Sequence, residues 1–363
     1  MLSMRIMLSM QKVAMHIRKL VAAHRPNKIA AVLSLLAATL AALGLAACGS
    51  TSSSSKSLAL VAYSTPQGAF EKLIPAFQAT PAGKGASFSQ SYGPSGEQSR
   101  AVVNGLHADV VNLSLEPDVE KLVKAGLVSP DWNKGATKGF VTDSVAVIIV
   151  RKGNPKHITS WNDLIKPGVG VLTPNPFTSG SARWNIMAAY GAQLKEGKTP
   201  RQAIQYLTSL FGNVVSQDSS ARDALQTFLA GRGDALIDYE DEAIADEKKG
   251  APIEYVIPKD TILIQNPIAV VGTGASATEA QKFVNYLLSP AGQRIWASEG
   301  YRPVIPGIVV LNPKTGASQF PTPTGLFTIA ALGGWKAVTK QFFEPETGVV
   351  TKIEQSLGAS TAK

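Results

Sequence analysis

The sequence predicts an α/β fold divided into two lobes. Short apolar runs alternate with amphipathic segments along most of the chain, as strands alternate with helices in α/β proteins. The body that follows residue 47 has 316 of the 363 residues, and a chain of that size usually forms two units with separate cores. We expect residues 58–143 and 267–363 to form one lobe and residues 144–266 the other.

The first lobe begins with two strand–helix pairs. A strand is predicted over Leu58–Tyr63 and a helix over Gly68–Gln78. The apolar side chains of this helix recur on one face, at Phe70, Leu73, Ile74 and Phe77. The second pair is a strand over Ala108–Leu113 and a helix over Asp118–Ala125, which ends at Gly126.

The second lobe begins with an uninterrupted apolar strand over Ser144–Val150, a composition typical of strands buried in a parallel sheet. The next expected elements are strands over Gly170–Thr173, Ala235–Tyr239 and Ile268–Val271 and helices that begin after Ser179 and Ser220. Helices over Thr278–Leu288 and Pro290–Ala297 and a C-terminal helical stretch complete the chain. We expect the chain to cross between the lobes near Thr142–Ser144 and near Asn266.

The N-terminal segment has the pattern of an export signal. Residues 1–47 contain six basic residues and no acidic residue, and an apolar run over Ile29–Leu45 follows the last basic residue. Ala46 and Ala47 then precede Cys48, the single cysteine of the chain. These features are typical of a secretory signal, and a cysteine after small residues resembles a bacterial lipobox. We therefore expect a signal peptide over 1–47 and a diacylglycerol on the sulfur of Cys48.

An alternative for this segment is an uncleaved helix that anchors the chain, although the apolar run is borderline in length for spanning a bilayer. A disulfide is excluded because the one cysteine has no partner in the chain. Residues 48–57 are rich in serine and too polar to be buried. We expect them to form a flexible, lipidated tether between the membrane and the folded body.

Cleavage also changes the charge of the protein. Removal of the six basic residues of the signal lowers the formal net charge from +9 to +3. The basic character of the chain therefore belongs mainly to the signal. Without it, the body lacks the strongly positive charge of nucleic-acid-binding domains, and we expect no nucleic-acid partner.

Three glycine- or serine-rich turns each open a predicted helix. They are residues 93–98 (Gly-Pro-Ser-Gly-Glu-Gln), 175–181 (Asn-Pro-Phe-Thr-Ser-Gly-Ser) and 218–223 (Asp-Ser-Ser-Ala-Arg-Asp). Ser95 and Gln98 have the spacing of a capping box, and Ser220 and Asp223 have the same spacing. An alternative is that all three turns are ordinary helix caps, since serine and glycine begin many helices.

The start of a helix is suited to anions. Its first backbone N–H groups lack partners, and it carries roughly half a unit of positive charge. Three such ends directed at one point would offer about 1.5 units of charge together with N–H donors. Glycine and serine at the turns let the backbone approach a ligand closely. This arrangement suits a small tetrahedral dianion.

Ten short motifs follow one another through nearly the whole body. They are Ser91–Gly96, Ala108–Val111, Arg151–Lys156, Trp161–Leu164, Pro167–Val169, Thr173–Pro176, Ala182–Asn185, Tyr239–Ala243, Tyr301–Pro303 and Gly333–Trp335. In this order they resemble the sulfate-binding proteins of bacterial sulfate/thiosulfate ABC importers, especially their Gram-positive lipoprotein branch. The resemblance implies a two-lobed type II periplasmic-binding-protein fold, in which each lobe is a mostly parallel sheet flanked by helices.

The resemblance also implies that dehydrated sulfate is held by uncharged donors. Carried onto this sequence, these are the hydroxyl and amide of Ser95, the amides of Ser179, Gly180, Ser181 and Ala221, and the side chain of Tyr239. The implied partners are the permease subunits of an ABC importer and the membrane that holds the lipid anchor. We expect a monomer without a cofactor or metal.

Three positions depart from the family's pattern. Well-known Gram-negative members have glycine at Ser181, tryptophan at Tyr239 and aspartate at Ser64. A backbone amide survives the first change, whereas a phenol hydroxyl reaches a different distance from an indole N–H and can also accept. Four further residues are expected to orient the anion contacts: Ser64, Gln98, Arg222 and Glu240. Arg222 either contacts the anion itself or braces its turn.

Selectivity in such a site depends on protons. Sulfate is a pure acceptor at neutral pH, whereas phosphate retains a proton that needs an acceptor. A pocket of donors leaves that proton unpaired, at a cost of roughly 1–3 kcal/mol. Molybdate, tungstate and thiosulfate lack the proton, so a binder of another oxyanion remains an alternative.

Other function classes have less support in the sequence. Five acidic residues lie close together, at Asp238, Glu240, Asp241, Glu242 and Asp246, but their spacing does not match a calcium loop. We expect them to form a solvated helix face. The body has two histidines, His107 and His157, in unrelated contexts and no phosphate-binding loop, so no catalytic residue is predicted. An oxyanion-processing enzyme is a distant alternative, and a surface adhesion protein would not explain the three turns.

Overall fold

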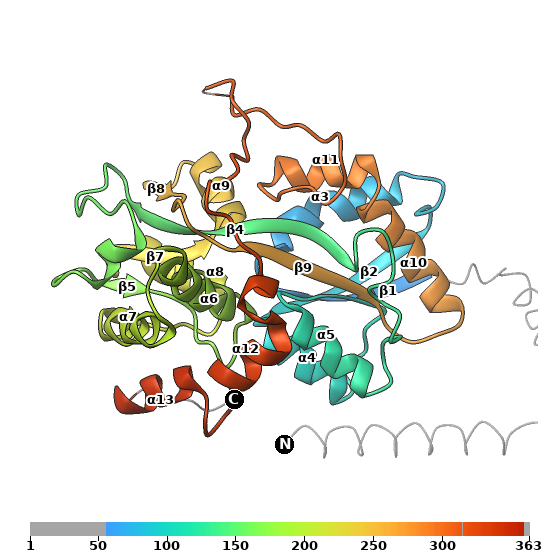
Figure 1. Cartoon of the computed structure of the whole chain (residues 1–363). Helices are drawn as coiled ribbons and strands as arrows, with labels where there is room; N and C mark the ends of the chain where they lie inside the picture. The colour runs from blue at the N-terminus through green and yellow to red at the C-terminus, as the bar shows by residue number, and fades with distance from the viewer. Residues whose placement is uncertain (1–55, 314, 359–363) are drawn as a thin grey trace, which may run out of the picture. The chain divides into compact units, whose positions relative to one another are not determined.

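The structure, a computed structural model, describes residues 56–313 and 315–358. The predicted signal peptide and lipobox lie outside the described residues, as does most of the tether. Within the described ranges, nine strands form a mixed sheet that is flanked by helices (Figure 1). The predicted α/β class is therefore confirmed. None of the helices in these ranges is long and apolar enough to cross a membrane.

Parallel pairing is confined to the two ends of the sheet. The strands are β1 Lys56–Tyr63, β2 Ala86–Gly93, β3 Val110–Asn112, β4 Phe140–Arg151, β5 Val171–Leu172, β6 Val214–Ser216, β7 Ala235–Tyr239, β8 Ile253–Val256 and β9 Leu263–Val270. Their order is β2-β1-β3-β9-β4-β7-β5-β6, and β8 also pairs with β4. β1 lies parallel to β2 and β3, and β5 lies parallel to β6 and β7.

Two long strands connect the two ends of this sheet. β4 and β9 run antiparallel, with Thr142 opposite Asn266 and Ser144 opposite Ile264 (Figure 1). Beyond this contact β9 pairs with β3, and β4 pairs with β7 and β8. The two crossings expected from the sequence thus lie side by side. The lobe boundaries drawn there remain a prediction.

The helices follow the sequence prediction closely. They are α3 Gln67–Gln78, α4 Ser95–Val103, α5 Glu116–Lys124, α6 Gly180–Lys195, α7 Pro200–Gly212, α8 Ala221–Leu229, α9 Glu240–Lys248, α10 Ala275–Leu287, α11 Pro290–Ser298, α12 Gly334–Phe342 and α13 Val349–Ser356. Every helix and strand predicted from the sequence is present, β7 with the predicted ends and the others with shifted ends. The strands β2, β6 and β8 and the helix α7 were not predicted.

Alternating side chains of β1 reach two separate cores. Leu58, Leu60 and Ala62 pack into a cluster with side chains of α3, α10 and α11. Val61 points the other way and packs with side chains of α4 and α5. Figure 1 accordingly shows α3 and α11 on one side of β1 and α4 and α5 on the other.

β4 has the same alternation but not the predicted direction. Ala146, Ile148 and Val150 pack with α6 and α7, whereas Val147 and Ile149 pack with α8. Helices cover both faces, so residues 145–150 are all apolar. The prediction that Ser144–Val150 is a parallel strand is wrong, because β4 is antiparallel to all three strands with which it pairs. Its composition reflects burial on two faces rather than strand direction.

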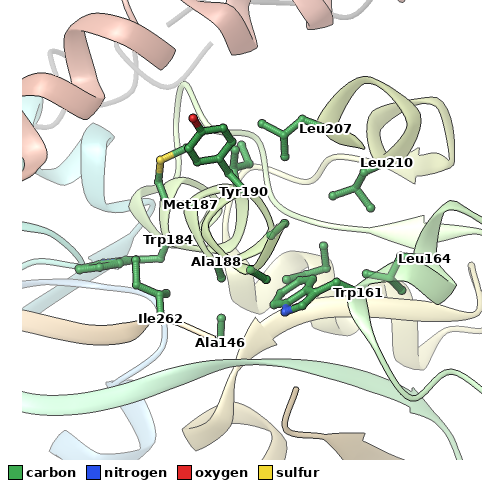
Figure 2. Packing of buried hydrophobic residues seen from close by; sticks show 14 of the residues in the cluster. Ala146, Trp161, Leu164, Trp184, Met187, Ala188, Tyr190, Leu207, Leu210 and Ile262 are labelled. Carbon is green, nitrogen blue, oxygen red and sulfur yellow. The ribbon is translucent and has the colours of Figure 1, made fainter. Parts of the chain in front are cut away.

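The core that contains Ala146, Ile148 and Val150 extends to the C-terminal helices. Figure 2 shows Trp184, Met187 and Tyr190 of α6 in this core, which also contains Trp161 and Leu207. The outer side of α6 is covered by α12, because the Trp184 and Tyr190 rings lie 4.6 Å and 4.7 Å from those of Trp335 and Phe342. Residues 334–356 thus pack with the core of residues 144–266, whereas they were expected in the other lobe.

We expect Ile148→Ala to lower the free energy of unfolding by about 2–5 kcal/mol, because it leaves a cavity between β4 and α6. Val309→Ala is the matched control, since Val309 is 77% exposed and should change stability by less than about 0.5 kcal/mol. Urea unfolding measures both. Equal effects of the two substitutions would contradict this description of the core.

Candidate anion-binding site

The three turns singled out in the sequence open three helices. α4 begins at Ser95, α6 at Gly180 and α8 at Ala221. The third start is capped as predicted, because the Ser220 hydroxyl accepts from the amide of Asp223 at 3.1 Å. Each turn therefore presents the N-terminus of a helix, where backbone N–H groups lack intrahelical partners.

Thr178, in the second turn, brings the three turns together. Its carbonyl oxygen accepts from the amide of Gly96 in the first turn at 3.1 Å. Its hydroxyl donates to the carbonyl of Ser219 in the third turn at 2.8 Å. The three helix starts are consequently neighbours, as a shared ligand requires.

Arg222 forms a second link between the third turn and the end of β1. Its guanidinium donates to the carbonyls of Ser64 and Thr65 at 3.2 Å and 3.0 Å. Of the two roles considered for Arg222, these contacts match bracing of the turn. Arg183 is also engaged, because its Nε donates to the carbonyl of Pro176 at 2.9 Å.

Several backbone amides at these starts remain free. In the described part of the chain, the N–H groups of Ser95, Gly180, Ser181 and Ala221 have no hydrogen-bond partner. The amide of Ser179 differs, because it donates to the carbonyl of Asn175 at 2.9 Å. The donor that Ser179 can offer to a ligand is therefore its hydroxyl, which pairs with that of Ser181 at 2.7 Å.

The backbone of Gly180 comes close to the first lobe. A Cβ atom on Gly180 would lie 2.8 Å from Leu115 Cδ2 and 2.9 Å from Ser114 Cβ. Gly96 is similarly restricted, because its Cβ would lie 2.9 Å from the carbonyl oxygen of Thr178. Glycine at these two positions therefore permits the contact between the turns.

The surroundings of Ser95 differ from the prediction. The Ser95 hydroxyl donates to Asp118 Oδ2 at 2.7 Å and accepts from the amide of Ser114 at 2.9 Å. Gln98 pairs with Ser91 rather than with the helix start. The predicted capping box is therefore wrong, since α4 has no side-chain cap. The longer-range contacts of both side chains replace it.

Tyr239 is fully buried at the junction of β7 and α9. Its hydroxyl lies 2.8 Å from that of Ser114, and either oxygen can be the donor. Burial raises the pKa of Tyr239 well above its ordinary value, so the phenol keeps its hydrogen. Its side chain thus meets Ser114, which in turn contacts Ser95 of the first turn.

The acidic residues of α9 are not a solvated face. Asp238, Glu240, Asp241 and Glu242 are all buried, and of the five only Asp246 is partly exposed. The prediction is wrong because the first turn of α9 packs into the interior beside β4. Glu240 forms a two-bond ion pair with Arg302, at 2.6 Å and 2.9 Å. Its carboxylate is thus held by Arg302.

Burial keeps protons on this acidic group. It raises the pKa of Asp241 to about 8 and that of Glu242 to about 7, and it also raises the pKa of Asp238. Asp241 accepts from the Ser144 hydroxyl at 2.6 Å. A carboxyl group that is uncharged at neutral pH can stay buried without a cation.

A cavity of about 200 Å³ lies beside these groups, between α3, α8, α9 and α11. Its lining mixes cations with carboxyl groups, including Lys72, Arg222, Lys248, Asp241 and Glu299. This mixture does not match a site that holds a dianion with neutral donors. The cavity is therefore not the candidate anion site.

The fold and these turns can be compared with known proteins. The family model for bacterial extracellular solute-binding proteins matches residues 58–302. The chain belongs to this family. A sulfate-binding protein of Synechococcus elongatus is 40% identical to this solute-binding protein over 335 residues, which cover 88% of this chain and 95% of the relative. A thiosulfate-binding protein of Pseudomonas aeruginosa is 34% identical and covers 85% and 95%.

A solved structure extends the comparison. The sulfate-binding protein SubI of Mycobacterium tuberculosis H37Rv matches this solute-binding protein with a TM-score of 0.74 and 43% identity, over 79% of this chain and 99% of SubI. The resemblance inferred from the sequence is thus confirmed, and so is the two-lobed type II fold that it implied. These relatives are named for binding rather than for a reaction.

Three residues of the site were missed by sequence reasoning. Thr178 was read only as part of its turn, and Ser114 and Asp118 carried no signal of their own. The contacts of all three are between segments distant in sequence. Periodicity and capping patterns describe neighbours along the chain and cannot identify such contacts.

The free energy of unfolding should fall as pH rises from about 4 to about 8. Asp241 and Glu242 have raised pKa values, so the folded state holds their protons more tightly than the unfolded state, and stability is lost as they ionise. Asp241→Asn should flatten this decline, and Asp131→Asn, on the surface, is the control. Urea unfolding across this pH range measures the slope. An unchanged slope in Asp241→Asn would contradict the raised pKa of Asp241.

Proposed function

We propose that this solute-binding protein captures sulfate outside the cell, between its lobes, and delivers it to the permease of an ABC importer. The observation that carries the proposal is the meeting of three helix N-termini around Thr178. Their free amides at Gly180, Ser181 and Ala221 are the donors that a small dianion requires. The relatives named for sulfate and thiosulfate support the same ligand class.

Main-chain dipoles rather than side-chain cations would compensate the charge of the anion. The guanidinium groups of Arg222 and Arg183 already donate to carbonyl oxygens at the turns. Three helix starts supply about 1.5 units of positive charge without a flexible cation. Such fixed donors suit a fully dehydrated ion, because they need little reorganisation when the ion arrives.

Discrimination against phosphate would follow from the scarcity of acceptors. The carboxylate nearest Ser95 is Asp118, which already accepts from Ser95 and pairs with Lys121 at 2.8 Å. A protonated oxyanion would therefore leave its hydrogen unpaired, at a cost of roughly 1–3 kcal/mol. Thiosulfate, molybdate and tungstate carry no such hydrogen, so selection against them would depend on the size of the site.

Calorimetric titration of the purified protein tests the ligand. We expect sulfate to bind more tightly than phosphate by at least about tenfold, which corresponds to about 1.4 kcal/mol. Tighter binding of molybdate than of sulfate would overturn the ligand assignment. Turnover of a sulfate or phosphate ester would replace the binding function with an enzymatic one.

Gly180→Ala should weaken sulfate binding by about tenfold or more, because its Cβ would meet Leu115 and Ser114 and hold the second turn away. Gly212→Ala is the matched control. Nothing lies within 4 Å of its Cβ position, so affinity should be unchanged. Circular dichroism shows whether both variants fold. Wild-type affinity in folded Gly180→Ala would contradict the proposed site.

We further propose that Cys48 carries a lipid that holds the exported protein at the outer face of the cytoplasmic membrane. The family is extracellular, and the residues before Cys48 have the lipobox pattern. Cys48→Ser should release the protein from the membrane fraction without changing its sulfate affinity. Retention of the variant in the membrane would contradict the lipid anchor and favour an uncleaved helix.

A further inference from the structure

Ser114 is the residue through which Tyr239 meets the first turn. It lies between β3 and α5, is 1% exposed and uses every polar atom. Its amide donates to the Ser95 hydroxyl at 2.9 Å, and its carbonyl accepts from Trp184 Nε1 at 2.9 Å and Asn266 Nδ2 at 3.0 Å. These four partners come from segments far apart in the sequence, so the position of Ser114 is fixed from several sides.

The Ser114 hydroxyl lies beside the free amides of the second turn. A Cβ on Gly180 would lie 3.0 Å from Ser114 Oγ. The N–H groups of Gly180 and Ser181 are among the unpartnered donors described above. An anion on those amides would therefore be next to Ser114 Oγ.

The hydroxyl pair of Ser114 and Tyr239 has one hydrogen to spare. Each hydroxyl carries one hydrogen, and the 2.8 Å contact between the two oxygens uses one of them. The Tyr239 hydroxyl also accepts from the side chain of Asn266, whereas in the described part of the chain the Ser114 hydroxyl has no other hydrogen-bond partner. One O–H group is thus left to donate elsewhere, and donation from Tyr239 to Ser114 strengthens Ser114 as a donor.

We propose that Ser114 is a specificity-determining residue of the anion site, which donates its hydrogen to the bound anion while Tyr239 donates to Ser114. The inference rests on the proposed function. It adds a contact between Ser114 and the anion and the direction of the hydrogen bond from Tyr239 to Ser114. Tyr239 then acts as a positioning residue. Its hydroxyl holds Ser114 Oγ as an acceptor on one side, so that the Ser114 hydrogen points toward the second turn.

This direction discriminates between anions. A protonated oxyanion that donated its hydrogen to Ser114 Oγ would turn the Ser114 hydrogen away from the anion. One hydrogen of the Ser114–Tyr239 pair would then be buried without a partner, at a cost that a dianion such as sulfate avoids. Without the Ser114 hydroxyl this discrimination would be lost, whereas without the Tyr239 hydroxyl the Ser114 hydrogen would no longer be held toward the anion.

Titration of the full chain and four variants with sulfate and with inorganic phosphate tests the proposal. We expect Ser114→Ala to weaken sulfate binding by about tenfold or more. Ser114→Ala should also lower the ratio of sulfate affinity to phosphate affinity by about tenfold, and Tyr239→Phe should weaken sulfate binding by a smaller factor. A residue that only supports the fold would weaken both anions equally and leave the ratio unchanged.

Two matched variants serve as controls. Ser99→Ala removes a buried hydroxyl that donates to the Asp118 carbonyl, and Tyr206→Phe removes one that donates to the Trp161 carbonyl. Both should keep the wild-type ratio. An unchanged ratio in Ser114→Ala, or wild-type sulfate affinity in Tyr239→Phe, overturns the role of the pair while the proposed function stands. Absence of sulfate binding by the wild-type protein overturns both.

Discussion

Helix N-termini repel one another, because each carries a partial positive charge. In this protein three of them are brought together by the backbone and hydroxyl of Thr178, which contact Gly96 and Ser219. The arrangement is electrostatically unfavourable when empty and favourable around an anion. Binding of an anion would therefore stabilise the contact between the turns.

The rest of the fold determines the positions of these three helix N-termini. β4 and β9 pair side by side along Thr142 and Asn266, so both halves of the sheet are attached to one antiparallel ribbon. Gly96 and Gly180 allow the turns to touch, since a Cβ at either position would meet an atom of the opposing segment. Near this ribbon, Ser144 donates to Asp241, whose pKa is raised by burial. Uncharged carboxyl groups there keep additional negative charge away from the anion.

The sequence predicted more of the local structure than of the contacts between segments. Strands, helices and the three turns follow from periodicity and helix-start patterns, which depend on neighbouring residues. The direction of β4 was mispredicted because burial on both faces gives the same composition in either direction. The acidic start of α9 was mispredicted because its pattern resembles an exposed face, whereas packing beside β4 buries Asp241 and Glu242.

Within the site, the turns were recognised but their connections were not. Ser95 was expected to cap its own helix with Gln98, and instead it contacts Asp118 and Ser114. Tyr239 was expected to offer its hydroxyl to the ligand, and nothing in the sequence indicated that this hydroxyl also meets Ser114. These contacts join residues that are 19 or more positions apart, for which a single sequence contains no pattern.

The position of a bound anion tests the central claim most directly. Crystals of the protein grown with selenate, a heavier analogue of sulfate, would locate the anion by the anomalous scattering of selenium. The account predicts a selenium peak whose oxygens lie about 3 Å from the amides of Gly180, Ser181 and Ala221. A peak in the cavity beside Lys72 and Lys248, with none at the three helix starts, would contradict it.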